Sequence, residues 1–205
     1  MPESLEALLE RIAAATPTPG GGTVSAICGA LSAALSRMVA NLAVGKQGYE
    51  AVQAELGSIE SKGSELLRRF LKLADKDAAA YEGVVAAMRM PKASDAERTM
   101  RKGAMQAAYK RATEIPMETI RACLDALELA KLAARHGNRN AITDAGVAAI
   151  LAESGMRGAA LNVRINVAAI SDASWRASTE AELESLLKRG EGVAHEVQAF
   201  VASKM

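Results

Sequence analysis

Residues 16–25 read TPTPGGGTVS, and a long run of Ala, Ser, Leu, Val and Met follows them up to residue 44. Two prolines and three consecutive glycines do not fit inside a helix, whereas the run after them predicts a buried helix over 23–44. Glycines allow a ligand to approach the backbone closely, and the free N–H groups at a helix start favour anions. The sequence therefore predicts a loop that is either a plain helix start or part of a ligand site formed by Pro19, Gly20, Gly21 and Gly22.

The composition of the 205-residue chain limits what its core is made of. Half of the residues are apolar, but only six are aromatic (two Phe, three Tyr and one Trp), so the core must consist of Ala, Leu, Val, Ile and Met. Small side chains let helices pack closely, and the length suits a single domain over 1–205. A formal net charge of +1 gives no strong field that would favour nucleic acid or an acidic membrane as a partner.

Apolar residues at helical spacing account for most of the chain, and no alternating strand pattern occurs. Ser94, with Glu97 three residues later, forms a capping-box pattern at one helix start. The third segment is either one long helix or a helix broken near Gly57 or Gly63, and Pro116 predicts a kink in the fourth. The sequence predicts an all-α bundle of long, partly kinked helices with small-residue packing seams, over 4–15, 23–44, 51–88, 94–135, 145–170 and 180–203.

Several features predict a cytoplasmic protein. Cys28 and Cys123 both fall in apolar helical patterns, so we interpret them as reduced core residues. The N-terminus has no basic region of the kind that begins a signal peptide. The segment 26–44 is only mildly apolar and is interrupted by Arg37, which favours a buried helix over a membrane span.

Asp77 interrupts an apolar stripe on the third predicted helix. Steps of three and four residues along this stripe give Leu66, Phe70, Leu73, Tyr81, Val84 and Met88. A carboxylate at such a position is costly to bury unless it is paired or hydrogen-bonded, and such groups often have a shifted pKa and a catalytic role. Asp77 is therefore either a catalytic group or a structural one bonded to a neighbouring helix or to Tyr81. Asp75 lies between two lysines on a solvated face and receives no role.

The glycine-rich opening and the motifs after it resemble a known family. The motifs are PGGGTV at 19–24, GAL at 29–31, MVANL at 38–42, GK at 45–46, MPK at 90–92, GNRN at 137–140, TDAGVAA at 143–149 and NVRIN at 162–166. Their order and spacing resemble the cyclodeaminase/cyclohydrolase family, which comprises the cyclodeaminase domain of formiminotransferase-cyclodeaminase and the stand-alone bacterial methenyltetrahydrofolate cyclohydrolases. The resemblance implies a homodimer that acts on a tetrahydrofolate derivative without a prosthetic group.

The polar residues in these motifs are candidates for binding a folate. Asn162 and Asn166 are four residues apart and share a helix face, where they either recognise a pterin ring or hydrogen-bond between helices. Asn41 has the same two interpretations. Asn140 and Asp144 fit a turn and a helix start by composition, and the resemblance makes them candidate site residues.

Two lysines are candidates for binding the anionic end of a folate. Lys46 follows the second predicted helix, and Lys92 lies between the third and the fourth. Each is either a solvated cation or a partner for a glutamate carboxylate, and Lys46 is the stronger candidate, near an anionic end or a leaving group. The two histidines lie far apart and no metal-ligand spacing occurs, so no metal site is predicted.

The resemblance implies one of two reactions. In the cyclohydrolase, water adds to the cationic methenyl carbon between N5 and N10 of tetrahydrofolate, and the adduct collapses to 10-formyltetrahydrofolate. In the cyclodeaminase, N10 attacks a formimino carbon on N5 and ammonia leaves. Both need an acid/base group beside a cationic carbon, for which Asp77 is the first candidate and Asp144 the second. We prefer the cyclohydrolase, because the chain stands without a formiminotransferase domain; the alternatives are the cyclodeaminase and a non-catalytic helical dimerisation protein.

Overall fold

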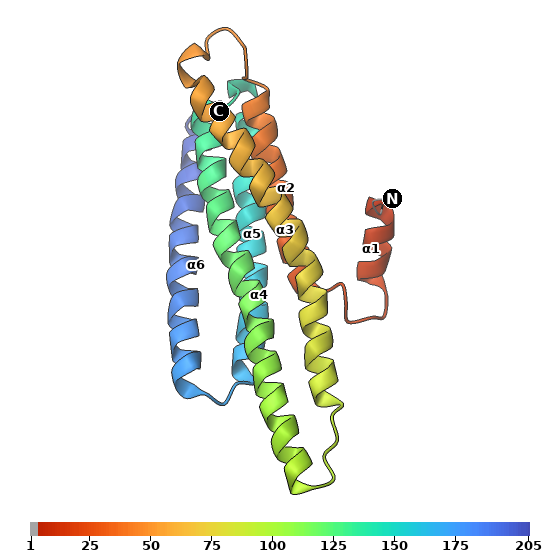
Figure 1. Ribbon diagram of the computed structural model, residues 1–205. Coiled ribbons are helices and arrows are strands. Elements are labelled where there is room, and N and C mark those ends of the chain that lie inside the picture. Colours follow the sequence, from red (N-terminus) through yellow and green to blue (C-terminus); the bar gives the residue numbers. More distant parts are fainter. Residues whose placement is uncertain (1–3) are drawn as a thin grey trace.

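The computed structural model describes residues 4–205, which form helices and connecting loops with no strand among them (Figure 1). The all-α class predicted from the sequence is therefore confirmed. The elements are α1 (Leu5–Ala13), α2 (Gly21–Asn41), the short 3-10 helix η1 (Glu50–Val52), α3 (Gln53–Met88), α4 (Asp95–His136), the short 3-10 helix η2 (Arg139–Ala141), α5 (Ile142–Ala168) and α6 (Ala173–Ala202).

The helices α2 to α5 form the central bundle. The α2 helix packs against α3, α4 and α5, and α6 packs against α4 and α5. The α1 helix stands apart from the bundle and buries none of its side chains (Figure 1). The hairpin of α3 and α4 projects beyond the other helices at the bottom of the view.

Glycines allow α2 to lie close to its neighbours. A Cβ at Gly29 would lie 2.7 Å from Cδ1 of Phe70 on α3, so a side chain there would overlap the ring. A Cβ at Gly155 on α5 would lie 2.6 Å from a carbonyl oxygen of α2. Sγ of Cys123 and Cβ of Cys28 also line this second contact; both cysteines are free, and Cys123 is buried whereas Cys28 is half-buried. The predicted small-residue seams are therefore present on two sides of α2.

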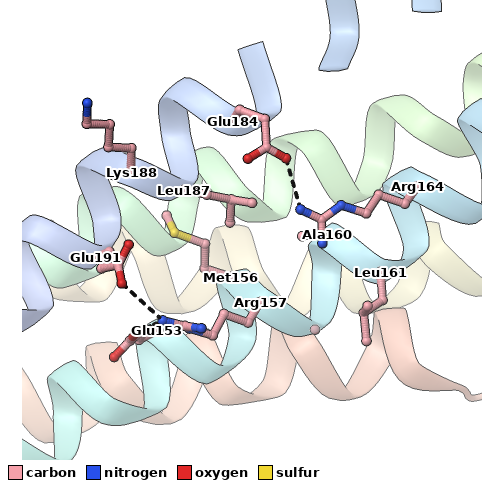
Figure 2. Close-up of a pocket in the computed structure, with 11 residues that line it drawn as sticks. Glu153, Met156, Arg157, Ala160, Leu161, Arg164, Glu184, Leu187, Lys188 and Glu191 are labelled. Atoms are coloured by element: carbon pink, nitrogen blue, oxygen red, sulfur yellow. Dashed lines mark hydrogen bonds and ion pairs between the residues drawn. The ribbon is translucent and has the colours of Figure 1, made fainter. Parts of the chain in front are cut away.

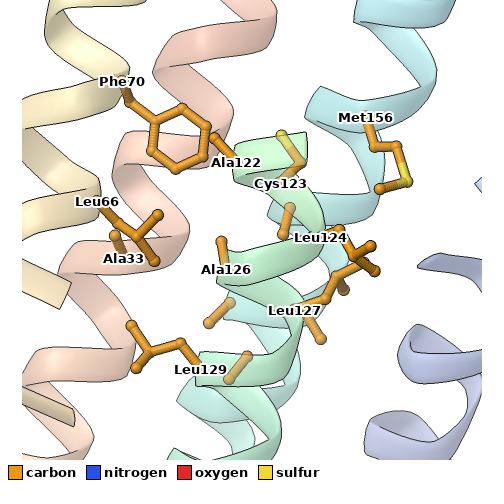
Figure 3. Packing of buried hydrophobic residues seen from close by; sticks show 14 of the residues in the cluster. Ala33, Leu66, Phe70, Ala122, Cys123, Leu124, Ala126, Leu127, Leu129 and Met156 are labelled. Atoms are coloured by element: carbon orange, nitrogen blue, oxygen red, sulfur yellow. The ribbon is translucent and has the colours of Figure 1, made fainter. Parts of the chain in front are cut away.

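The core is built from these small residues and a few large ones. Figure 3 shows Leu66 and Phe70 of α3 pointing toward Ala33 of α2 and Ala122 of α4. Phe70, Ala33 and Ala122 are fully buried. One large ring thus fills the space that several alanines leave open, which agrees with a core poor in aromatic residues.

Several helix boundaries differ from the predictions. The α2 helix begins at Gly21 and not at residue 23, so two of the three glycines form its first turn; it ends at residue 41 and not 44. The α5 helix begins three residues earlier than predicted, directly after η2. The α6 helix begins at Ala173 and not at residue 180, because the carboxylate of Asp172 accepts a hydrogen bond of 3.1 Å from the backbone N–H of Trp175. Its polar first turns hid this start from a search for apolar periodicity.

The α3 helix is one unbroken helix, so Gly57 and Gly63 interrupt nothing. Gly63 has a packing role, because a Cβ there would lie 2.8 Å from Cδ of Arg37 on α2. The predicted capping box at the start of α4 is confirmed: Oγ of Ser94 accepts from the N–H of Glu97 at 3.2 Å, and the Glu97 carboxylate accepts from the N–H of Ser94 at 2.9 Å.

The α2 helix is long and apolar enough to cross a membrane by length and composition. Within the bundle, 56% of its most apolar 18-residue window is buried. A core helix passes the same test, and the contacts of α2 with three other helices of the bundle fit that interpretation.

Pro116 lies inside α4, and the helix continues through it. Proline has no N–H, so the carbonyl of Ala112 one turn earlier loses its helical partner. The side-chain amide of Asn166 on α5 donates a hydrogen bond of 2.9 Å to that carbonyl. This is the inter-helix hydrogen bond that was one of the two interpretations of Asn166, and it ties α5 to α4 where the bond within α4 is missing.

We predict that Asn166→Ala lowers the free energy of unfolding by about 1–3 kcal/mol, because it leaves the carbonyl of Ala112 without a partner. The same substitution should cost less in a Pro116→Ala background, where residue 116 regains an N–H for that carbonyl. Urea unfolding of the parent, the two single variants and the double variant measures the coupling. An equal cost in both backgrounds would show that Asn166 does not replace the missing bond.

Candidate functional site

Asp77 on α3 lies against the start of α2. Oγ1 of Thr23 donates a hydrogen bond of 3.1 Å to Oδ2 of Asp77. A Cβ at Gly22 would lie 2.7 Å from Oδ2 and even closer to Oδ1. The missing side chain at Gly22 therefore makes room for the carboxylate. The structure thus brings together two features that the sequence marked separately, the interrupted stripe and the glycine-rich segment.

Burial raises the pKa of Asp77 above its usual value of 3.8. The hydroxyl and the backbone N–H of Thr23 both hydrogen-bond to the carboxylate and lower the pKa, but desolvation is the larger effect. The residue is only half-buried, so solvent reaches part of it. Such a group exchanges a proton closer to neutral pH than an ordinary aspartate does, which suits general acid/base chemistry.

Other predicted residues lie around the start of α2. Pro19 is buried, and Gly20 is the N-cap of α2 without a side chain to cap the helix. Gly21 is exposed, and a Cβ there would find Nδ2 of Asn162 on α5 as its nearest neighbour at 3.8 Å. Tyr81 is exposed one turn further along α3. Glycine backbone, the amide of Asn162 and the carboxyl group of Asp77 therefore lie together at one end of α2, and Tyr81 is one helical turn away from Asp77 on α3.

A second group of predicted residues lies at the opposite end of α2. Asn41 is the last residue of α2, Lys46 is exposed in the loop after it, Asn140 lies in η2 and Asp144 in the first turn of α5. The backbone N–H of Asn138 donates to the carbonyl of Val39 at 2.9 Å, and its side chain donates to that of Leu42 at 2.8 Å. These bonds fix the start of α5 beside the end of α2.

The two groups are far apart within one chain. The 19 residues from Gly22 to Asn41 correspond to about 28 Å of helix. The 18 residues from Asp144 to Asn162 on α5 correspond to about 27 Å. The structure therefore does not bring Asp144 or Lys46 to Asp77 in the same chain.

Lys92 lies apart from both groups. It is exposed in the loop between α3 and α4. With Arg98, Arg101 and Lys102 it lines a hollow of about 300 Å³ at the tip of that hairpin. Asn166 is likewise separate, since its amide is engaged by the carbonyl of α4.

Thr23 was not among the site residues predicted from the sequence. Its hydroxyl is the side-chain partner that holds Asp77, and the residue is buried. Its position directly after three glycines could have marked it as a site residue. The helix was predicted to begin at residue 23, however, and that prediction did not indicate that the side chain of Thr23 faces α3.

A larger hollow between α5 and α6 contains none of the predicted residues (Figure 2). It measures about 470 Å³, and charged side chains of both signs line it. Arg164 pairs with Glu184 at 2.9 Å, and Arg157 lies 3.8 Å from Glu191. These pairs neutralise both arginines of the lining, and Lys188 is the one lining cation for which the described residues provide no ion pair. Across residues 4–205, no cluster of three His, Cys, Asp or Glu side chains could hold a metal ion.

Comparisons with known proteins show the family to which the chain belongs. The family described as Formiminotransferase-cyclodeaminase matches residues 4–185. The chain is 38% identical to a methenyltetrahydrofolate cyclohydrolase of Methylorubrum extorquens, over 99% of this chain and 98% of that protein. It is 31% identical to a formimidoyltransferase-cyclodeaminase of Rattus norvegicus over 90% of this chain, which spans 34% of that longer protein. The chain belongs to the formiminotransferase-cyclodeaminase family.

A solved structure agrees with this assignment. The crystal structure of a formiminotetrahydrofolate cyclodeaminase from Thermotoga maritima matches 98% of this chain and 97% of its own, with a TM-score of 0.90 and 33% sequence identity. The relatives are enzymes of folate metabolism, as the motifs indicated. The resemblance inferred from the sequence is therefore confirmed.

Gly22→Ala is predicted to destabilise the fold by about 1–3 kcal/mol, because the added methyl group overlaps the carboxylate of Asp77. Gly21→Ala is the matched control: it adds the same methyl group one residue earlier, where nothing lies within 3.4 Å. Thermal and urea unfolding of both variants measures the difference. Equal stabilities would mean that residue 22 does not limit the approach of α2 to Asp77.

Asp77→Asn is predicted to raise stability relative to the parent at neutral pH, because Asn removes a charge that burial disfavours. With a folded-state pKa above 3.8, the native protein binds more protons than the unfolded chain between pH 3.8 and that pKa. Stability therefore falls as pH rises through this window, and the penalty is absent below it. The Tm difference between Asp77→Asn and the parent should widen from acid to neutral pH. A difference that narrows with rising pH would contradict the raised pKa.

Proposed function

We propose that the protein is a 5,10-methenyltetrahydrofolate cyclohydrolase, which hydrolyses the methenyl bridge to give 10-formyltetrahydrofolate. The observation that carries the proposal is the half-buried carboxyl group of Asp77 at the start of α2, with its raised pKa. The near full-length similarity to a methenyltetrahydrofolate cyclohydrolase supports this reaction.

Asp77 suits the two proton transfers of the hydrolysis. Water adds to the methenyl carbon and loses a proton, which the carboxylate accepts. The tetrahedral adduct then collapses: the bond from the former methenyl carbon to N5 breaks, N5 takes up a proton from the carboxyl group, and the hydroxyl of the adduct releases its proton to solvent as it becomes the formyl C=O, which is the net proton released in the reaction. As a carboxylate, Asp77 also stabilises the cationic substrate by its charge. One group thus serves as base and then as acid, and it ends the cycle in its starting state.

The remaining residues are proposed to bind the folate. The glycine backbone of 19–22 lets the ring system approach α2 closely, while Asn162 and Tyr81 offer hydrogen bonds beside it. Lys46 and Lys92 are proposed partners for anionic groups, and Asn41, Asn140 and Asp144 complete the proposed set; Asn166 is left out of it, because its amide is bonded to the carbonyl of Ala112. The proposal includes a homodimer that acts in the cytoplasm and needs no prosthetic group.

A second candidate is a formiminotetrahydrofolate cyclodeaminase. The solved structure with a TM-score of 0.90 carries that name, and it too is a chain of about this length. In this reaction N10 attacks a formimino carbon on N5, and Asp77 would donate the proton that lets ammonia leave.

The assay follows the loss of ultraviolet absorbance of 5,10-methenyltetrahydrofolate in a buffer that hydrolyses it slowly. The parent protein should accelerate the loss and yield 10-formyltetrahydrofolate. Asp77→Asn should fold and lose about 10²–10⁴-fold in turnover, the usual contribution of an acid/base group. Asp75→Asn, two residues away on the exposed face, should keep the parent's activity. Full activity of Asp77→Asn would remove Asp77 from the mechanism.

The same preparation distinguishes the second candidate. If the parent does not accelerate methenyl hydrolysis but releases ammonia from 5-formiminotetrahydrofolate, the protein is a cyclodeaminase. If it does neither, the remaining interpretation is a non-catalytic dimerisation protein. A folate analogue should then fail to raise the Tm, whereas a binding site raises it by mass action.

A further inference from the structure

A hollow of about 490 Å³ lies at the end of the bundle where the C-terminus is found (Figure 1). It is formed by the last turn of α4, by η2, by the first residue of α5 and by the end of α6. Three of its six lining side chains are cations and none is a carboxylate; the lining consists of Ala134, Arg135, Arg139, Ile142, Phe200 and Lys204. The hollow is therefore a positively charged cavity of small-molecule size.

The cations of this hollow have no anionic partner. Among residues 4–205, the side chains of Arg135, Arg139 and Lys204 form no hydrogen bond or ion pair. The ammonium group of Lys204 lies 5.4 Å from the centre of the Phe200 ring, which places it on one wall of the hollow. Glu196, a carboxylate one turn before Phe200 on α6, is already paired with Lys131. The positive charge of the hollow is therefore left for a ligand.

The arginines of the other charged hollows are already engaged. Both arginines in the hollow between α5 and α6 are paired with glutamates. At the tip of the α3–α4 hairpin, Arg98 is paired with Asp95, and Arg101 donates a hydrogen bond of 3.0 Å to the carbonyl of Met88. In the hollow at the end of α6, by contrast, two guanidinium groups keep their N–H donors free, and free guanidinium groups are suited to bind phosphate in a bidentate manner.

Helix dipoles explain only part of this charge. Arg135 lies in the last turn of α4, and Lys204 follows the C-cap of α6, where a cation interacts favourably with the helix dipole. Arg139 belongs to the three-residue helix η2, which has no dipole of that size. The backbone N–H of Arg139 donates a hydrogen bond of 3.0 Å to Oη of Tyr49, and this bond fixes the backbone from which the guanidinium group reaches the hollow. The convergence of three cations from three elements therefore needs another explanation.

We propose that this hollow binds a phosphorylated small molecule of the nucleoside diphosphate class. The diphosphate carries about three negative charges at neutral pH, which the two arginines and Lys204 balance. Phe200 and Ile142 are half-buried, so the exposed part of each offers an apolar surface to the ring of such a ligand. None of these residues belongs to the proposed folate site, so the inference does not depend on the proposed function.

Calorimetric titration of the whole chain with ADP tests the site. The parent should bind one ADP per chain, and Arg135→Gln and Arg139→Gln should each weaken binding about tenfold or more, because each removes charge-assisted hydrogen bonds to phosphate. Both side chains are exposed, so both variants should keep the parent's Tm without ligand.

Arg89→Gln is the matched control. Arg89 is an exposed arginine at the C-cap of α3, so its substitution removes the same charge from the same kind of helix end, but it does not line the hollow. This variant should bind ADP as the parent does. Equal affinities of the Arg135→Gln, Arg139→Gln and Arg89→Gln variants would show that ADP does not bind in this hollow.

Fragments of the ligand show which part of it is recognised. Pyrophosphate should bind more weakly than ADP because it lacks the ring, and adenosine should bind more weakly still because it lacks the charge. Citrate, a carboxylate trianion without a ring, should also bind more weakly than ADP. Citrate binding as tight as that of ADP would show that the hollow selects charge alone and would overturn the assignment. No binding of either ADP or pyrophosphate would overturn the site itself, whether or not the protein hydrolyses methenyltetrahydrofolate.

Discussion

The close approach of α2 to its neighbours depends on positions that carry no side chain. Gly29 receives the ring of Phe70, and Gly155 receives the backbone of α2, so α2 lies flat between α3 and α5. In the first turn of α2, Gly22 likewise leaves space for a neighbouring group. There the group is the carboxylate of Asp77 and not an apolar side chain. Glycines that elsewhere allow apolar side chains to pack in the core allow a carboxyl group to lie against the start of α2 at this position.

The proposed acid/base role of Asp77 depends on how far its carboxylate is buried. A fully exposed aspartate would be ionised at every working pH, and a fully buried one would be closed to a substrate. Asp77 is held between these limits, because Thr23 supplies hydrogen bonds while burial raises the pKa. The position suits a reaction in which one group must accept a proton from water and return it to N5, beside a substrate that carries a positive charge.

Helical periodicity in the sequence was sufficient to predict the fold class and to single out Asp77 as a carboxylate within an apolar stripe; its catalytic role stays a prediction. Helical spacing predicted the bundle, and a single break in an apolar stripe marked Asp77. The role of Thr23 was not accessible, since it depends on α2 starting at Gly21, and helix ends are the least periodic part of a helix. The separation of Asp144 and Lys46 from Asp77 was also hidden, because motifs that belong to one family can lie at opposite ends of a long helix.

The most direct test of the central assignment is a carbon-13 NMR titration of the side-chain carboxyl of Asp77, identified by its absence in Asp77→Asn. Desolvation against Gly22 and Thr23 predicts a titration midpoint above 3.8, the usual value for an aspartate, and a further change on adding a folate ligand. A midpoint at or below 3.8, with no response to a folate, would show that the hydrogen bonds of Thr23 outweigh burial and that Asp77 is a structural residue.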